Sequence, residues 1–150
     1  DCGQHYASGE TTLMFAARAG MERVCELLIE KDVDVNLRKL RNKTALMFAA
    51  AGGYTNICLK LISNGAKLDY KDFDGYTALS YAIKSCHQQV CEILLEKGAC
   101  PSSELENFWL RLIQDGSLLK PPSGNAIYLL RAAKFGFKNL CLHLLKNGVD

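Results

Sequence analysis

The sequence has few prolines, one tryptophan, little net charge and no long apolar run. Its 150 residues include three Pro and one Trp. No apolar stretch approaches the ~18 residues that a membrane-spanning helix requires, so we expect no membrane contact. The formal net charge is only +2, and such a balance does not favour a nucleic-acid partner. Apolar residues make up 49% of the chain, which is typical of a soluble globular domain.

Motifs that bind cofactors, metals or phosphate groups are missing as well. His5 and His143 stand apart from any nucleophile motif, and no glycine-rich phosphate loop is present. Cys86, His87 and Cys91 lie close together in the sequence, but their spacing matches no zinc-ligand pattern. We therefore expect no enzyme active site, no cofactor and no metal site within these residues.

What the sequence does contain is a segment that recurs every 33 residues. The letters T-A-L-M-F-A-A at residues 44–50 have close copies at residues 11–17 (T-T-L-M-F-A-A) and 77–83 (T-A-L-S-Y-A-I). A fixed period of this length indicates stacked copies of one small structural unit. Such stacks usually work through their surface and not through a buried catalytic cleft.

The cysteines follow the same period. Cys25, Cys58 and Cys91 are 33 residues apart, and Cys141 holds the same place in a fourth copy. Equivalent helices in a stack lie ~8–10 Å apart, whereas a disulfide requires Cα atoms within ~7 Å. We expect these side chains to be free thiols that are buried like small apolar residues. Free thiols in number indicate a reducing compartment, so we expect the cytoplasm, with the nucleus or a host cytosol as alternatives.

Each copy predicts two short helices and a loop. In the second copy, Thr44 is a suitable N-cap for a helix from about residue 45 to 51. Gly53 then breaks the helix. A second helix follows from about residue 56 to 64, and Gly65 suits the left-handed position just past its end. The other copies repeat this order, so the sequence predicts an all-α stack.

The pattern G-x-T-x-L-x-x-A-A-x-x-G followed by V-x-x-L-L-x-x-G-A resembles the ankyrin repeat, whose period is 33. The matching residues in the third copy are Gly75, Thr77, Leu79, Ala82, Val90, Leu94, Leu95, Gly98 and Ala99. The resemblance implies an all-α ankyrin-repeat solenoid of about four helix-turn-helix repeats. It also implies loop fingers that project from the helices, and partners that dock on the fingers and on the inner helices of the concave side.

We expect one ankyrin-repeat domain over residues 1–150, with repeats at about 9–41, 42–74, 75–100 and 123–150. A helical insertion at 101–122 separates the last two repeats. Its apolar residues follow helical spacing, and they are Leu105, Phe108, Trp109, Leu112 and Ile113. We expect Ser103 and Glu106 to form a capping box at its start. Either this helix covers an apolar face of the stack, or Phe108 and Trp109 anchor a partner.

The predicted partner-binding residues lie in two fingers, on the inner helices and in the insertion. They are Arg38, Leu40, Arg41, Lys43, Phe73, Tyr76, Arg18, Lys84 and Trp109. A basic surface that contains aromatic residues suits an acidic protein or peptide. The alternative is that these charges only keep the surface solvated.

The sequence therefore predicts a monomeric, non-catalytic protein–protein interaction module, of the kind used as a scaffold. Alternatively, the chain is a regulatory or targeting domain of a larger enzyme or secreted effector whose catalytic part lies outside it. The chain opens on Asp1 without an initiator Met, and we expect it to be a segment of a longer protein.

Overall fold

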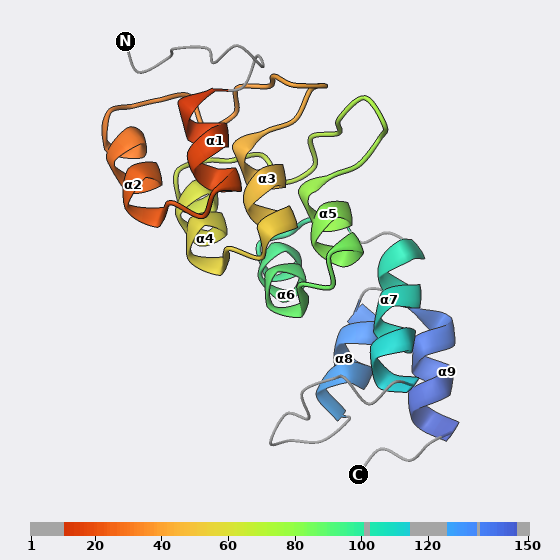
Figure 1. Cartoon of the computed structure of the whole chain (residues 1–150). Helices are drawn as coiled ribbons and strands as arrows, with labels where there is room; N and C mark the ends of the chain where they lie inside the picture. The colour runs from red at the N-terminus through yellow and green to blue at the C-terminus, as the bar shows by residue number, and fades with distance from the viewer. Residues whose placement is uncertain (1–10, 101–102, 115–125, 135, 147–150) are drawn as a thin grey trace. The chain divides into compact units, whose positions relative to one another are not determined.

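The computed structural model describes residues 11–100, 103–114, 126–134 and 136–146, and these residues form nine α-helices (Figure 1). The chain divides into two compact units, residues 1–100 and 101–150. Among the described helices, none combines the length and the apolar character that crossing a bilayer would require.

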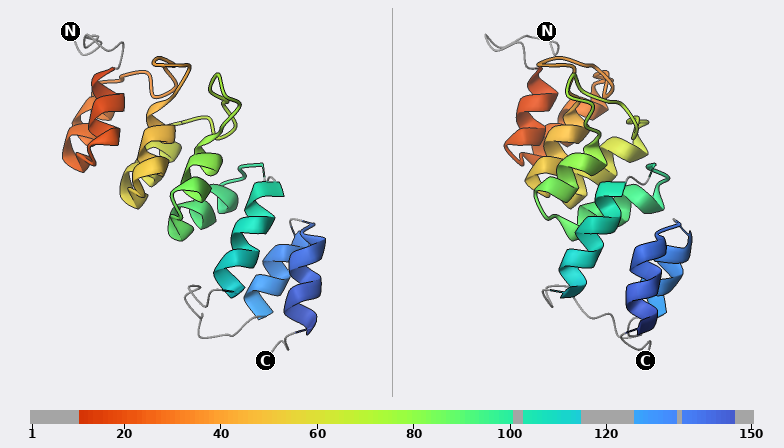
Figure 2. Two further views of the ribbon diagram at one scale, coloured as in Figure 1. Left: turned by 45° about the vertical axis from the view of Figure 1, so that its right-hand side comes forward. Right: turned by 90° about the vertical axis from the view of Figure 1, so that its right-hand side faces the viewer.

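The first unit contains three helix pairs. The first helices of the pairs, called inner helices below, are α1 (Thr12–Arg18), α3 (Ala45–Gly52) and α5 (Ala78–Lys84). The second helices, called outer helices, are α2 (Glu22–Glu30), α4 (Thr55–Ser63) and α6 (Gln88–Glu96). Inner helices pack against inner helices and outer against outer, so the pairs form a stack (Figure 2). The predicted repeat architecture is confirmed.

Threonine begins each inner helix, as the sequence predicts. The hydroxyl oxygens of Thr11, Thr44 and Thr77 accept hydrogen bonds from backbone N–H groups three residues later, at 3.2, 3.3 and 3.3 Å. Each bond satisfies one of the N–H groups that have no partner inside the helix. The loops that precede Thr44 and Thr77 are the two fingers of this unit, finger 1 (residues 37–43) and finger 2 (residues 70–76). They project from one end of the helices (Figure 2).

The stack buries one apolar row after another. Val24 on α2 is 38% exposed, whereas the equivalent Ile57 and Val90 on α4 and α6 are each 1% exposed. The difference arises because α4 and α6 each pack against the outer helix that precedes them. Each repeat thus needs a neighbour to bury its apolar side, which is the physical basis of a repeat stack.

The cysteine row lies inside this stack. Cys25, Cys58 and Cys91 are buried free thiols. Burial is the main reason that their pKa values rise to about 11, about 12 and about 12. The predicted row of buried thiols is confirmed for these three residues. Cys141, the predicted fourth member, is only half-buried.

The second unit contains α7 (Ser103–Gln114), α8 (Ala126–Lys134) and α9 (Lys138–Lys146). Helices α7 and α8 both pack against α9. On α9, Leu140 and Leu144 are buried. Helices α8 and α9 form the helix pair that the fourth predicted repeat requires, and α7 is the helix predicted in the insertion.

The capping box predicted for α7 is wrong. The Glu106 Oε1 atom accepts hydrogen bonds from the backbone N–H groups of Asn139 and Leu140, at 2.7 and 3.1 Å. These are N–H groups of the first turn of α9, which have no partner within that helix. A carboxylate is also favoured there by the positive end of the helix dipole. Glu106 therefore ties α7 to α9 and does not cap its own helix.

Candidate partner-binding surface

A row of aromatic rings crosses the inner helices. Phe15, Phe48 and Tyr81 hold the same position on α1, α3 and α5, and they are 33 residues apart. Phe15 is exposed, while Phe48 and Tyr81 are half-buried. We call the surface that carries this row, together with the bases of the two fingers, the inner face.

Lys43, at the base of finger 1, lies between two rings of this row. Its Nζ atom is 5.7 Å from the ring centroid of Phe48 and 4.8 Å from that of Tyr81. An ammonium group over a ring is attracted by the negative face of the ring, which contributes ~0.5–1 kcal/mol at an exposed site. The two rings thus hold the charge of Lys43 at the junction of the second and third repeats.

Two more cations stand on aromatic rings at either side of Lys43. The Arg18 guanidinium carbon is 5.7 Å from the ring centroid of Phe15. The Lys84 Nζ atom is 3.2 Å from the ring centroid of Tyr76, which occupies the place of Lys43 one repeat later. The inner face therefore carries positive charge on each of the three repeats.

A hollow of about 300 Å³ lies on this face. Its lining residues are Arg18, Lys43, Met47, Phe48, Ala51, Gly52 and Tyr81. Two of these side chains are cationic, most of the others are apolar or aromatic, and no carboxylate is among them. The hollow can thus take a group that combines negative charge with an apolar part.

The Tyr81 ring is held in place by a buried carboxylate at the start of the turn in finger 2. The Tyr81 hydroxyl donates to Asp72 Oδ2 at 2.5 Å, and Asp72 Oδ1 accepts the backbone N–H groups of Asp74 and Tyr76 at 3.0 and 2.9 Å. Asp72 is 5% exposed. Burial alone raises the pKa of this carboxyl, but the hydrogen bonds from Tyr81, Tyr76 and Asp74 outweigh it and lower the pKa.

The same network acts on the tyrosine. Burial, followed by the hydrogen bond to the Asp72 carboxylate, raises the pKa of Tyr81 to about 12. The hydroxyl therefore stays protonated and continues to donate at neutral pH. Sequence reasoning missed Asp72, although an Asp shortly before a Gly is a signal of a side-chain-stabilised turn.

The two fingers are joined to one another. The Arg41 Nη2 atom lies 2.9 and 3.2 Å from the two carboxylate oxygens of Asp74. The Phe73 N–H donates to the Arg41 carbonyl at 3.1 Å, and Asn42 Nδ2 donates to the Lys71 carbonyl at 2.9 Å. Arg41, predicted as a partner-binding residue, is thus engaged in holding finger 1 against finger 2.

The remaining predicted residues do not gather at one place. Phe73 is 76% exposed at the tip of finger 2, but Leu40 at the equivalent place in finger 1 is half-buried, not fully exposed as predicted for a finger tip. The Arg38 guanidinium carbon lies 4.8 Å from the ring centroid of Tyr70. Trp109 belongs to the second unit, where its side chain is 5% exposed.

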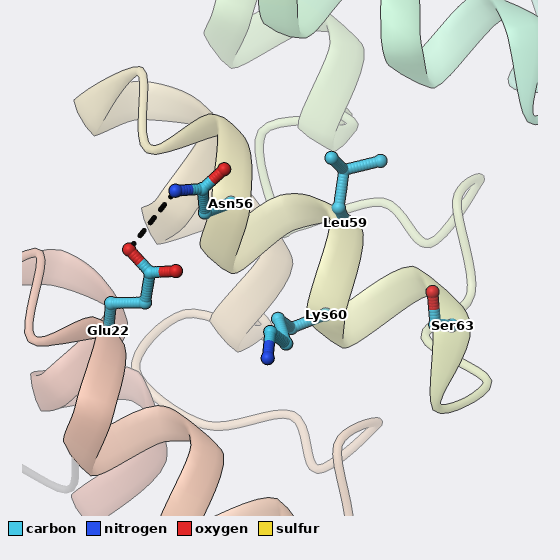
Figure 3. Close-up of a pocket in the computed structure, with 5 residues that line it drawn as sticks. All are labelled: Glu22, Asn56, Leu59, Lys60 and Ser63. Carbon is cyan, nitrogen blue, oxygen red and sulfur yellow. Dashed lines mark hydrogen bonds between the residues drawn. The ribbon is translucent and has the colours of Figure 1, made fainter.

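A second hollow, of about 330 Å³, lies on the outer helices α2 and α4 and has no comparable chemistry. It is lined by Glu22, Asn56, Leu59, Lys60 and Ser63. Asn56 Nδ2 donates to Glu22 Oε2 at 3.2 Å, so these two polar groups satisfy each other. Figure 3 shows that Leu59 and Ser63 lie away from this pair. The side chains therefore do not converge on a ligand position.

Comparison with known proteins agrees with this architecture. A family model for ankyrin repeats, in three copies, matches residues 13–104, which is more than half of the chain. The chain belongs to the ankyrin-repeat family. Ankyrin repeats are generally protein–protein interaction modules. The match ends before α8 and α9, so it does not include the predicted fourth repeat. No curated protein matched the chain in the same comparison.

Proposed function

We propose that this chain is a non-catalytic module that binds an acidic protein or peptide on its inner face. The observation that carries the proposal is the hollow of about 300 Å³ with cationic walls and an apolar floor. Complementary charge speeds the encounter with an acidic partner and selects against other partners. The apolar floor supplies burial that charge alone does not provide.

Lys43 is central to this proposal. Within the part of the chain that the structure describes, its Nζ atom forms no ion pair with a carboxylate, and its close contacts are the rings of Phe48 and Tyr81. An ammonium group between two rings keeps N–H donors that point away from them. A partner carboxylate at this place therefore gains a charge-assisted hydrogen bond.

The proposed surface uses some of the predicted residues more than others. Arg18, Lys43, Tyr76 and Lys84 form it, and the exposed Phe73 stands at its rim. Trp109 is not part of it because its side chain is buried. We also propose that the module acts as a monomer in the cytoplasm, a compartment that keeps thiols such as Cys25, Cys58 and Cys91 reduced.

A selection from a displayed library of random peptides on the intact chain tests this function. We expect the selected peptides to be rich in Asp and Glu. Their binding should be lost in the Lys43→Glu variant, because like charges repel in the hollow. The matched control is Lys39→Glu, which makes the same change of charge on the same finger at a residue that does not line the hollow.

Circular dichroism of both variants establishes that each is folded. Selected peptides that bind Lys43→Glu as tightly as the unchanged chain would place the binding surface elsewhere. A selection that enriches no peptide at all would contradict the function itself.

A further inference from the structure

We infer that the partner segment is an extended, polyproline II-like peptide that carries a carboxylate side chain at every third residue. This inference rests on the proposed function and adds the conformation and spacing of the ligand. The peptide would run across α1, α3 and α5, along the row of aromatic rings on the inner face.

The spacing follows from the positions of the cations. Arg18 comes from the first repeat, Lys43 lies between the rings of the second and third repeats, and Lys84 stands on Tyr76 in the third. The inner helices pack directly against one another, and packed helices have axes ~8–10 Å apart. Positive charge therefore recurs along the face in steps of about that length.

A polyproline II helix has the matching period. It has three residues per turn and rises ~3.1 Å per residue, so every third side chain lies on the same side, about 9 Å from the last. In a β-strand the side chains on one face are only about 7 Å apart. An α-helix has a diameter of ~10–12 Å with its side chains, which is wide for a hollow of about 300 Å³.

The aromatic rings favour the same conformation. Proline-rich segments in the polyproline II conformation dock on grooves lined by aromatic side chains. Here Phe15, Phe48 and Tyr81 supply one ring per repeat. Residues between the carboxylates would rest on these rings and on Met47, which belongs to the apolar floor of the hollow.

The surface is also ordered before a ligand arrives. Tyr81 is held by its hydrogen bond to the buried Asp72 carboxylate, and Lys43 is held by the two rings beside it. Binding therefore costs little additional side-chain entropy. A peptide that already favours the polyproline II conformation loses little entropy as well, which makes the pair well matched.

Fluorescence anisotropy with defined peptides and the intact chain tests the inference. The first peptide has Glu at every third residue among Pro and Ala. The second has the same composition and length, but its Glu residues are contiguous. The third is an Ala-rich helix former with Glu at every seventh residue, which gives a similar spacing along an α-helix. We expect the first peptide to bind at least about tenfold more tightly than either of the others.

We expect Lys43→Gln to weaken binding of the first peptide, while Lys39→Gln leaves it unchanged. The comparison among the three peptides uses the unchanged protein, so it does not depend on the folding of any variant.

Equal binding of the first two peptides would overturn the spacing but leave the proposed function standing. Tighter binding of the helical peptide would overturn the extended conformation. Absence of binding by all three, together with a library selection that returns acidic peptides, would overturn the spacing and the conformation only. If that selection also fails, the proposed function fails with them.

Discussion

The two fingers of the first unit occupy equivalent places but are built by different chemistry. In finger 1, Leu40, Arg41 and Asn42 all adopt the left-handed backbone region, with φ of 47°, 62° and 68°. Paired backbone hydrogen bonds between Lys39 and Lys43, at 3.1 and 2.7 Å, close the loop. A left-handed conformation costs ~1–2 kcal/mol for each residue with a side chain, so finger 1 is strained.

Finger 2 avoids this strain. Asp72 stands where finger 1 has Lys39, and its carboxylate and backbone hold the turn by accepting three N–H groups. Gly75, with φ of 83°, is the left-handed residue of this finger, and a glycine bears no steric cost there. Because finger 1 is hydrogen-bonded to finger 2, the comparison teaches that the unstrained finger supports the strained one.

The largest effect is expected from Asp72→Ala. The change leaves the Tyr81 hydroxyl and two backbone N–H groups without their acceptor, and hydrogen bonds to a buried charged group contribute ~1.5–3 kcal/mol. We expect the free energy of unfolding in urea to fall by about 2–3 kcal/mol. Lys39→Ala at the equivalent place in finger 1 should cost less than about 0.5 kcal/mol. Similar losses for both variants would contradict the asymmetry between the fingers.

Gly75→Ala should have the next largest effect. The added methyl group meets no atom of another residue within 4 Å, so the cost comes from the backbone alone. At φ of 83° we expect a loss of about 1–2 kcal/mol of unfolding free energy in the same urea measurement.

The matching change in finger 1 is Asn42→Gly. It relieves strain but removes the hydrogen bond to the Lys71 carbonyl. These effects oppose one another, and we expect a net change within about 0.5 kcal/mol. A neutral Gly75→Ala would show that the loop relaxes away from its left-handed turn.

The ion pair between the fingers should contribute less. Both side chains are largely exposed, and the Nη2–Oδ1 distance is 2.9 Å. A double-mutant cycle of Arg41→Ala and Asp74→Ala should give a coupling of ~0.2–1 kcal/mol that decreases as salt is added. A coupling that is unaffected by salt would indicate that the two side chains interact through something other than charge.

The smallest effect is confined to acid. The pKa of Asp72 is lower in the folded chain than in the unfolded one, so the folded state binds fewer protons. Its stabilisation is complete above the unfolded pKa of ~3.9 and is lost as the pH falls through the folded pKa. The difference in stability between the unchanged chain and Asp72→Asn should therefore shrink below about pH 4. Urea unfolding at a series of pH values measures it, and a constant difference would contradict this role of Asp72.

Features that repeat along the chain could be predicted from the sequence. The threonine caps, the helix pairs and the buried thiols each recur at a fixed interval, and each depends on local geometry. Pairings that depend on the positions of distant elements could not be predicted. Glu106 meets the start of α9, and Arg41 meets Asp74, because packing brings them together.

The candidate surface was predictable to a similar extent. Arg18, Lys43, Tyr76 and Lys84 were expected at contact positions, and the structure brings them together on the inner face. The sequence did not show that Lys43 turns toward two rings while Arg41, two residues earlier, turns toward the other finger. That choice depends on where the rings and Asp74 lie in space.

The cysteine row also makes each of the first three repeats its own clock. With thiol pKa values of about 11 to about 12, Cys25, Cys58 and Cys91 carry almost no reactive thiolate at neutral pH while they stay covered. An alkylating reagent would reach each sulfur only when its own repeat opens. The order in which the three are modified, read by mass spectrometry, would thus report where the stack comes apart first.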